Sequence, residues 1–293
     1  MSMVITASMV KELRAKTGAG MMDCKNALTE TGGDTEKAID FLRERGIAKA
    51  AGKAGRQTSE GLIVSRLTDD LKSGAVLEIS CETDFVARTD DFQNFSSQLI
   101  EQALAEEPAA NIDEFLSRPF AADSGQSVAE AVQTQIGKLG ENMQLRRVEK
   151  LTAGDGGALS TYNHPGDKLA VLVEFRGVSD PSDDGFTRLA RDIAMHIAAA
   201  APQAVSREQL NQDAIERERE IYRQQAINEG KPEKIVDKIV NGKIDKYYGE
   251  VALLEQAFVK DPDTSVGDLL KSKAADIGQS LAVTRFTRYL LGG

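Results

Sequence analysis

Tryptophan is absent from the 293-residue chain, cysteine and histidine each occur twice, and aromatic residues make up only 5% of the sequence. The two cysteines, Cys24 and Cys81, are too few and too far apart for a disulfide framework or a zinc site. Apolar runs are far shorter than the roughly 20 residues that cross a bilayer, and the first residues lack the basic and apolar regions of a secretion signal. We therefore expect a reduced, cytoplasmic protein with no membrane partner.

Positive charge is also scarce, since 36 Lys and Arg residues face 46 Asp and Glu residues and leave a net charge of −10. A protein that binds nucleic acid directly needs a basic surface to replace the counterions of the phosphates. Direct binding of nucleic acid is therefore not expected. The hydrophobic content of 41% is sufficient for a folded core. Because 293 residues exceed what one core usually holds, the sequence predicts two or more domains.

The first 46 residues have the pattern of three short helices. Apolar residues recur at helical spacing in each, and Asp34 is placed to cap a third helix that Gly46 should end. A unit of this size is near the lower limit of independent stability, so we expect a binding module or a docked appendage. The basic segment 47–58 is interpreted as a solvated tether. Residues 1–55 are assigned to this module and its linker.

A pattern of strand, polar turn, strand, loop and helix then occurs twice. The first copy covers residues 61–67, 74–80 and 91–106, and the second covers 157–162, 169–175 and 184–200. Two copies of such a unit predict an α+β fold with two related core lobes. We assign lobe 1 to residues 56–151 and lobe 2 to residues 152–205 and 249–293.

Residues 206–248 interrupt the second lobe with a highly charged helical pattern. Ser206-Arg-Glu-Gln209 is typical of a capping box, and Gly230-Lys-Pro232 predicts a turn between two helices. The prediction is an antiparallel, coiled-coil-like hairpin about 35 Å long. The positions expected to face each other are Leu210, Ala214, Ile221 and Ile227 on the first helix and Ile235, Ile239, Ile244 and Tyr247 on the second.

Four carboxylates and two phenylalanines crowd into Glu82-Thr-Asp-Phe-Val-Ala-Arg-Thr-Asp-Asp-Phe92, directly after the second strand of lobe 1. This composition is compatible with a metal site, an acid/base pair, a helix cap or a surface that contacts another protein. The acids do not have EF-hand spacing, and a chain without tryptophan has little with which to build a glycosidase sugar platform. Asp90 or Asp91 is placed to cap the next helix, with Phe92 and Phe95 facing the core.

Phe85 is not explained by a cap or by a core position. It lies between the strand end and the helix cap with charged neighbours, which is typical of an aromatic anchor in a protein interface. The chain has no phosphate-loop motif, no nucleophile-elbow motif and no Cys/His pair close in sequence. The residues alone therefore favour a binding protein over an enzyme, with no metal or cofactor.

The histidines and the paired methionines each have two interpretations. His196 lies in an apolar helical stretch and is expected to be a core residue. His164 lies on a predicted hairpin turn and is either a turn residue or a partner contact. Met21 and Met22 follow a glycine-rich turn and either fill the core of the small module or form an adaptable contact surface.

We find a close resemblance to the two signature stretches of the bacterial translation elongation factor Ts family in Lys11-Glu-Leu-Arg-Ala-Lys-Thr-Gly-Ala-Gly-Met-Met-Asp-Cys-Lys-Asn-Ala-Leu28 and Cys81-Glu-Thr-Asp-Phe-Val-Ala87. The resemblance covers essentially the whole chain. It continues through Lys138-Leu-Gly-Glu-Asn142, Tyr162-Asn-His-Pro-Gly166, Gly230-Lys-Pro232 and Phe258-Val259.

The resemblance implies a guanine-nucleotide exchange factor for elongation factor Tu, with a UBA-like N-terminal module, two core lobes and a protruding hairpin. It implies no catalytic residue, no metal and no cofactor. The partner would be elongation factor Tu in its GDP-bound and nucleotide-free states, in a complex that could be 2:2, and the chain could also form a homodimer.

In the family, a corner between a strand and the next helix enters the partner near its magnesium and phosphate site and accelerates GDP release. This corner maps onto Thr83, Asp84, Phe85 and Val86. Further partner contacts map onto Arg14, Met21, Met22, Leu139, Gly140, His164 and Val259, with Leu139 standing where isoleucine is usual. Two rival classes stay open. One is a dimeric structural adaptor built on the hairpin, and the other is a carboxylate hydrolase.

Overall fold

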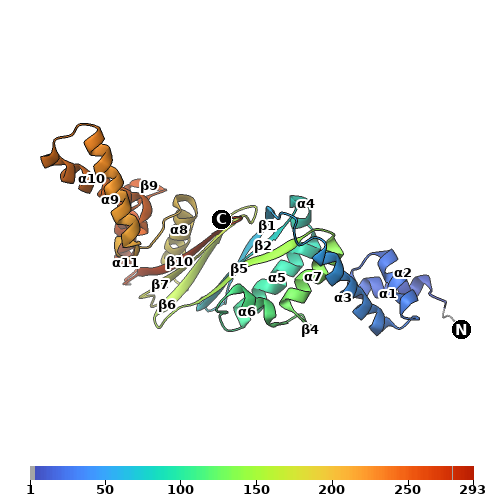
Figure 1. Ribbon diagram of the computed structural model, residues 1–293. Coiled ribbons are helices and arrows are strands. Elements are labelled where there is room, and N and C mark those ends of the chain that lie inside the picture. Colours follow the sequence, from blue (N-terminus) through green and yellow to red (C-terminus); the bar gives the residue numbers. More distant parts are fainter. Residues whose placement is uncertain (1–3, 279) are drawn as a thin grey trace. The chain divides into compact units, whose positions relative to one another are not determined.

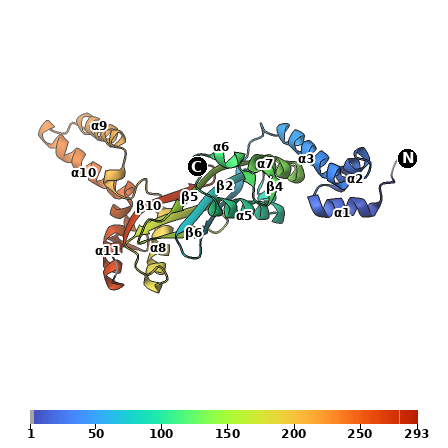
Figure 2. The same ribbon diagram turned by 90° about the horizontal axis from the view of Figure 1, so that it is seen from below.

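The computed structural model describes residues 4–278 and 280–293 and combines helices with antiparallel β-sheets (Figures 1 and 2). The α+β class predicted from the sequence is therefore confirmed. The described chain divides into two compact units. Unit 1 comprises residues 4–64, 77–149 and 291–293, and unit 2 comprises residues 65–76, 150–278 and 280–290. The finer division into a UBA-like module, two related lobes and a coiled-coil arm stays a prediction.

Three helices begin unit 1 and enclose a small apolar cluster. The Thr6 and Asp34 side chains cap the first and third helices by accepting backbone N–H groups at 3.3 and 3.2 Å. Leu13, Cys24 and Leu28 are fully buried between the three helices. The helices are α1 (Ala7–Thr17), α2 (Met21–Glu30) and α3 (Thr35–Ala51).

Helix α3 does not end at Gly46, so that prediction was wrong. Gly46 is buried where α3 crosses α7 (Val128–Leu139), opposite Gly137. A Cβ atom added to Gly137 would lie only 2.8 Å from the Cα atom of Gly46. Gly46 therefore serves a close helix crossing instead of a helix end, because only residues without side chains allow two helix backbones to approach this closely.

Gly137→Ala is expected to loosen the crossing of α3 and α7, since the added methyl group meets backbone and not a flexible side chain. The expected cost is about 1–3 kcal/mol, as for other overpacked contacts. Hydrogen exchange of the α7 amides measures this change in local stability.

The matched control is Gly242→Ala in α10 (Glu233–Val251), where an added methyl group meets no atom within 4 Å. This substitution should stabilise its helix by roughly 0.5–1 kcal/mol, because alanine has the higher helix propensity. If Gly137→Ala also slowed exchange, the close crossing of α3 and α7 would be refuted.

Helices α5 (Asp90–Ala105) and α7 lie beside a three-stranded sheet with the strand order β1-β2-β5 (Figures 1 and 2). Phe92 and Phe95 are buried, as predicted. The predicted cap of α5 was wrong, because the Phe92 N–H donates to the Thr89 hydroxyl at 3.3 Å and to neither aspartate. Asp90 and Asp91 occupy the first turn, where their charges favour the helix dipole.

The bounds of these strands are Glu60–Leu67 for β1, Ser73–Cys81 for β2 and Met143–Thr152 for β5. Several elements of this part of the chain were not predicted from the sequence. They are β5, α7, α6 (Ile112–Ser117) and the short strands β3 (Pro119–Phe120) and β4 (Asp123–Ser127). Charged residues occupy much of β5, and β3 and β4 are too short for a periodic pattern to appear.

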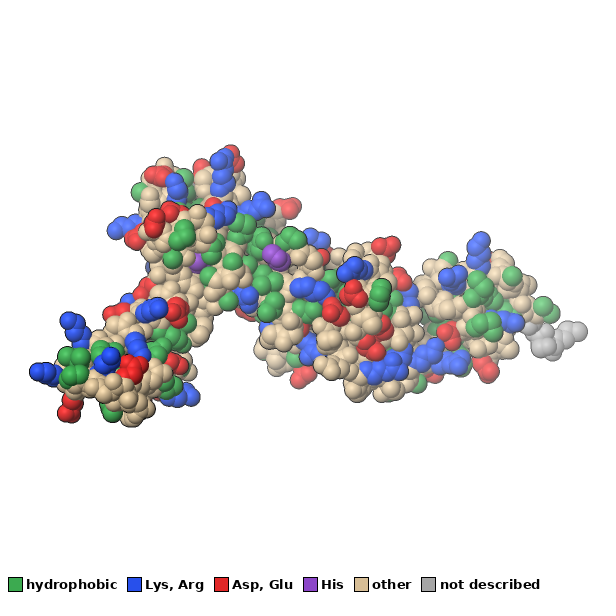
Figure 3. Space-filling model, turned by 90° about the horizontal axis from the view of Figure 1, so that it is seen from above, with side chains coloured by type: hydrophobic (Ala, Val, Ile, Leu, Met, Phe, Trp, Pro, Cys, Tyr) green, Lys and Arg blue, Asp and Glu red, His purple; other side chains and the backbone are tan. Residues whose placement is uncertain are grey.

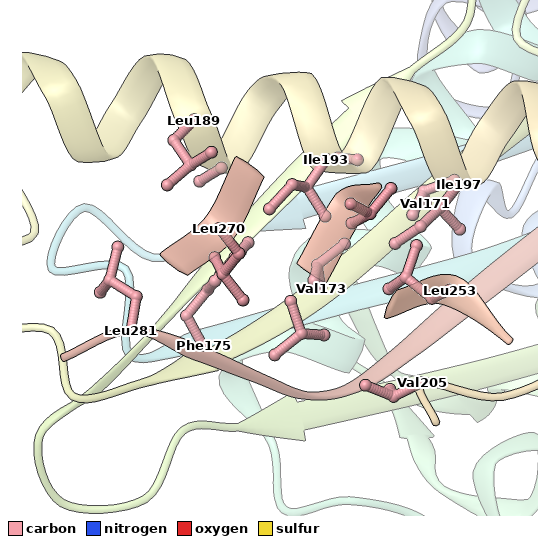
Figure 4. Packing of buried hydrophobic residues seen from close by; sticks show 14 of the residues in the cluster. Val171, Val173, Phe175, Leu189, Ile193, Ile197, Val205, Leu253, Leu270 and Leu281 are labelled. Atoms are coloured by element: carbon pink, nitrogen blue, oxygen red, sulfur yellow. The ribbon is translucent and has the colours of Figure 1, made fainter. Parts of the chain in front are cut away.

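Unit 2 is built on an antiparallel sheet with the strand order β10-β7-β6, packed against α8 (Asp184–Ala200). The strands are β6 (Gly157–Asn163), β7 (Leu169–Arg176) and β10 (Ala282–Leu290). Figure 4 shows Val171 and Val173 of β7 on the side of the sheet that faces Ile193 and Ile197 of α8, with Phe175 beside Leu270. The core is completed by α11 (Val266–Asp276), which follows the short strands β8 (Ala257–Phe258) and β9 (Asp261–Ser265).

Two helices of unit 2, α9 (Gln212–Asn228) and α10, pack against each other. The predicted capping box was wrong, because Arg207–Gln209 forms a single 3₁₀ turn and Asn211 caps α9 instead. Leu210 lies between the 3₁₀ turn and Asn211. Because its backbone is extended and its side chain is buried, α9 begins only after it.

The apolar positions predicted for this helix pair were partly wrong. Ile221, Ile227 and Ile235 are 48%, 50% and 39% exposed. Leu210 and Ile244 are buried as predicted, and Ile239 and Tyr247 pack against the same cluster. The cluster also takes in residues one position away from predicted ones, because helical rotation places neighbouring residues about 100° apart. Its buried members in the two helices are Ile215, Ala226, Val236, Val240, Ile244 and Val251.

Candidate protein-binding site

The corner after β2 is a short helical turn that exposes a phenylalanine. Strand β2 ends at Cys81, and α4 (Asp84–Ala87) begins after Thr83, whose hydroxyl accepts the Val86 N–H at 3.3 Å. Ala87 is buried and anchors the turn, whereas Phe85 on the same turn is 81% exposed. An aromatic ring exposed to this degree contributes little to the stability of the free protein, because most of its apolar surface stays in water.

Glu141 holds the corner from a distant part of unit 1. Its carboxylate accepts the Thr83 N–H at 3.0 Å and the Thr83 hydroxyl at 2.6 Å. The Cys81 thiol adds a third bond by donating to the Thr83 carbonyl at 3.1 Å. Two bonds to one ionised carboxylate fix direction as well as distance. The Phe85 ring therefore projects from a turn whose cap is itself held in place.

The Leu139-Gly140 turn ends α7 and lies next to this corner. Gly140 has the left-handed backbone conformation (φ 82°) that favours glycine at a helix end. Just beyond it, the Asn142 N–H donates to Glu82 at 2.6 Å, so this bond, like those of Glu141, links the end of α7 to the corner. The structure therefore brings together two segments that the sequence analysis had identified separately.

The segment before β1 ties the same two segments together. The Lys53 ammonium donates to the Gly140 carbonyl, and Arg56 pairs with Glu82 at 3.5 Å. The Asn142 amide also donates to the Arg56 carbonyl at 2.8 Å. The interpretation of residues 47–58 as a solvated tether was therefore wrong, because Lys53 and Arg56 hold the α7 turn and the corner. Basic composition alone does not reveal such contacts.

Sequence reasoning missed Glu82, Glu141 and Asn142 as parts of this site. The signal was available in part, since Gly-Glu-Asn follows Leu139 in one of the stretches that resemble the family. Their role became visible only with the fold, because each bonds a residue that is distant in sequence.

Asp84 makes a surface ion pair with Arg88 at 3.0 Å, one helical turn further along the chain. Both side chains are well exposed, and such pairs contribute little to stability. The hydrogen bonds that orient the corner thus come from Thr83, and Asp84 stays accessible to a partner. Val86 is half-buried beside it.

Other predicted contacts of unit 1 lie on the N-terminal helices. Arg14 is exposed on α1, and Met21 and Met22 are 55% and 64% exposed at the start of α2. The interpretation of both methionines as core residues was therefore wrong. Flexible thioethers on a surface are suited to an adaptable contact.

Unit 2 carries the remaining two predicted contacts, His164 and Val259. His164 is exposed on the turn between β6 and β7, and its Nδ1 atom lies 3.1 Å from the Tyr162 hydroxyl. Val259 is exposed just after β8, and its backbone N–H donates to the His196 Nδ1 atom at 3.2 Å.

His196 is fully buried, which confirms its predicted core position. Because its Nδ1 atom accepts from Val259, the proton lies on Nε2, which donates to the side-chain amide oxygen of Gln256 at 2.9 Å. Burial lowers the pKa of His196, although the bond to Gln256 opposes this shift. A neutral histidine thus holds the backbone beside an exposed valine.

The carboxylates around the corner are engaged with other groups of the protein. Glu82, Glu141 and Asp91 all bond protein groups, with Asp91 pairing with Lys138 at 2.7 Å. Among residues 4–278 and 280–293, no group of three or more His, Cys, Asp or Glu side chains could hold a metal ion. In the same part of the chain, no helix is long and apolar enough to cross a bilayer. The fold and site define an α+β chain in which polar contacts hold an exposed apolar corner.

Comparison with known proteins gives the family. Residues 82–293 match the sequence model of the family described as Elongation factor TS. The protein named Elongation factor Ts from Trichlorobacter lovleyi is 44% identical over 294 residues, covering 99% of this chain and 93% of that protein. Its namesakes from Clostridium novyi and Chloroherpeton thalassium are each 46% identical over 289 residues, covering 99% and 98% of this chain and 93% and 98% of those proteins. The chain therefore belongs to the bacterial elongation factor Ts family.

Proposed function

We propose that this protein is a guanine-nucleotide exchange factor for elongation factor Tu and acts through the Asp84-Phe85 corner. The observation that carries the proposal is the 81% exposed Phe85 ring on a turn whose cap makes two hydrogen bonds to Glu141. A large ring held in a fixed direction is suited to enter a pocket of a partner. The corner would enter near the partner's magnesium and phosphate site.

The proposed mechanism requires no covalent step. Magnesium and phosphate-binding donors hold a nucleotide in a GTPase, so a wedge that disturbs both lowers nucleotide affinity. By linkage, the nucleotide lowers the affinity of the wedge by the same factor. The exchange factor therefore accelerates release of GDP and leaves when GTP binds. Phe85 supplies apolar bulk, and Asp84 remains available for hydrogen bonds to the partner.

The surroundings of the corner support a second contact with the same partner domain. The Leu139-Gly140 turn is bonded to the corner through Glu141 and Asn142, so both segments would reach the partner together. Arg14, Met21 and Met22 on the N-terminal helices, and His164 and Val259 in unit 2, are proposed as further contacts. A homodimer or a 2:2 complex is part of this proposal.

The test is the release of a fluorescent GDP analogue from the cognate elongation factor Tu, with excess unlabelled GDP present. Substoichiometric protein should accelerate release, because an exchange factor turns over. The rival adaptor would bind elongation factor Tu without changing the release rate, and that result would refute the proposal. A hydrolase would instead convert the nucleotide, which chromatography of the mixture would reveal.

A further inference from the structure

A cavity in unit 1 is lined by residues other than those that form the corner. It has a volume of about 310 Å³ and lies among α1, α2, α3, α7 and β4. This volume is at the lower end of the range for small-molecule sites. Its basic lining residues are Lys16, Arg43, Arg45, Lys49 and Lys138.

The charge of the cavity is opposite to that of the chain. Five basic and two acidic side chains line it, so its formal charge is +3 in a protein whose net charge is −10. On the face in Figure 3, basic side chains gather beside the N-terminal helices, whereas elsewhere both signs are mixed. A concave surface of one sign concentrates ions of the other sign.

Ion pairs occupy three of the five basic side chains. Lys138 pairs at 2.7 Å with Asp91, which lies outside the lining, so the excess that remains is +2 and lies on Lys16 and Arg45. Lys49 pairs with Asp23 and Arg43 with Asp123, both at 3.1 Å. All four side chains are partly exposed, so these pairs contribute little and can yield to a more highly charged ligand. Arg45 lies over the Phe41 ring, 5.9 Å from its centroid, which orients its guanidinium without neutralising it.

The start of helix α2 adds hydrogen-bond donors to the same lining. Gly20 occupies the cap position of this ten-residue helix, makes no side-chain cap and lines the cavity. Backbone N–H groups at such a helix start favour an anion. The Thr17, Thr134 and Gln126 side chains also line the cavity, but they already donate to the Leu13 carbonyl, Gln126 and Asp123.

We propose that this cavity binds a small anion with at least two phosphate groups, held by Lys16, Arg45, Lys49 and Lys138. Two phosphate groups match the +2 that remains in the lining, which a single carboxylate would not neutralise. Such a ligand would connect the N-terminal helices to α7 at Lys138, directly before the Leu139-Gly140 turn. The binding itself does not depend on the proposed exchange function.

The experiment is a calorimetric titration of inorganic pyrophosphate into the full chain at low, fixed ionic strength and without elongation factor Tu. We expect one saturable site. Lys16→Ala/Arg45→Ala should weaken binding roughly tenfold or more, because two charge-assisted contacts are lost. The control Lys234→Ala/Lys238→Ala removes two exposed lysines from α10 and should change the affinity less than about twofold.

Sulfate provides a second control, because it offers one anionic group where pyrophosphate offers two. It should bind roughly tenfold or more weakly than pyrophosphate. Absence of saturable pyrophosphate binding, or equal losses in the two double variants, would overturn the proposal. Equal affinity for sulfate would show a general attraction for anions and would overturn it too. Since the partner is absent from every titration, failure here would leave the proposed exchange function untouched.

Discussion

Replacing Phe85 with alanine is expected to slow protein-stimulated GDP release by about thirtyfold or more. Aromatic anchors of protein interfaces typically contribute at least about 2 kcal/mol, and roughly 1.4 kcal/mol corresponds to a factor of ten. The loss should persist at saturating concentrations of the exchange factor, because the ring acts as the wedge in the proposed mechanism. The measurement is the release rate of fluorescent GDP from elongation factor Tu over a range of variant concentrations.

The stability of the free variant is the first control for this experiment. Because Phe85 is 81% exposed, its removal should change the free energy of unfolding by no more than about 0.5 kcal/mol. The matched apolar control is Ile227→Ala on α9, where an exposed side chain is removed outside the proposed contacts. A stable Phe85→Ala variant that stimulates release as well as the wild type would remove the corner from the mechanism.

Glu141→Ala is expected to produce the second large effect, although Glu141 is not proposed to touch the partner. The substitution removes both bonds from Thr83 to Glu141 and leaves only the Cys81 bond to Thr83, so the corner should occupy its productive geometry for a smaller fraction of the time. The apparent affinity falls in proportion to that fraction, and a tenfold smaller population would require about tenfold more protein. The maximal release rate should change much less, because Phe85 is still present.

The distinction between positioning and contact can be tested directly. Glu141→Gln keeps one acceptor oxygen for Thr83 and should restore part of the lost affinity. Glu107→Ala removes an exposed carboxylate elsewhere in unit 1 and should behave as the wild type. If Glu141→Ala lowered the maximal rate as strongly as Phe85→Ala did, Glu141 would have a direct role and the positioning model would fail.

Parts of the site were predictable because their signals are local. The strand before the corner is an apolar run, and the helix after it has Phe92 and Phe95 at helical spacing. Phe85 was identified because it did not fit that spacing. The cap of α5 was assigned one or two residues too late, because Thr89, Asp90 and Asp91 are all competent caps and the local sequence does not choose among them.

The chain by itself determined the α+β class, the buried face of α5 and the family to which it belongs, because periodicity and signature stretches are properties of neighbouring residues. Only the tertiary structure decided how the corner is held. Thr83 and Glu141 are 58 positions apart, and Lys53 and Gly140 are 87 apart. Hydrogen bonds between such distant residues leave no periodic pattern in the sequence. They form only after packing has brought β2, the end of α7 and the segment after α3 together.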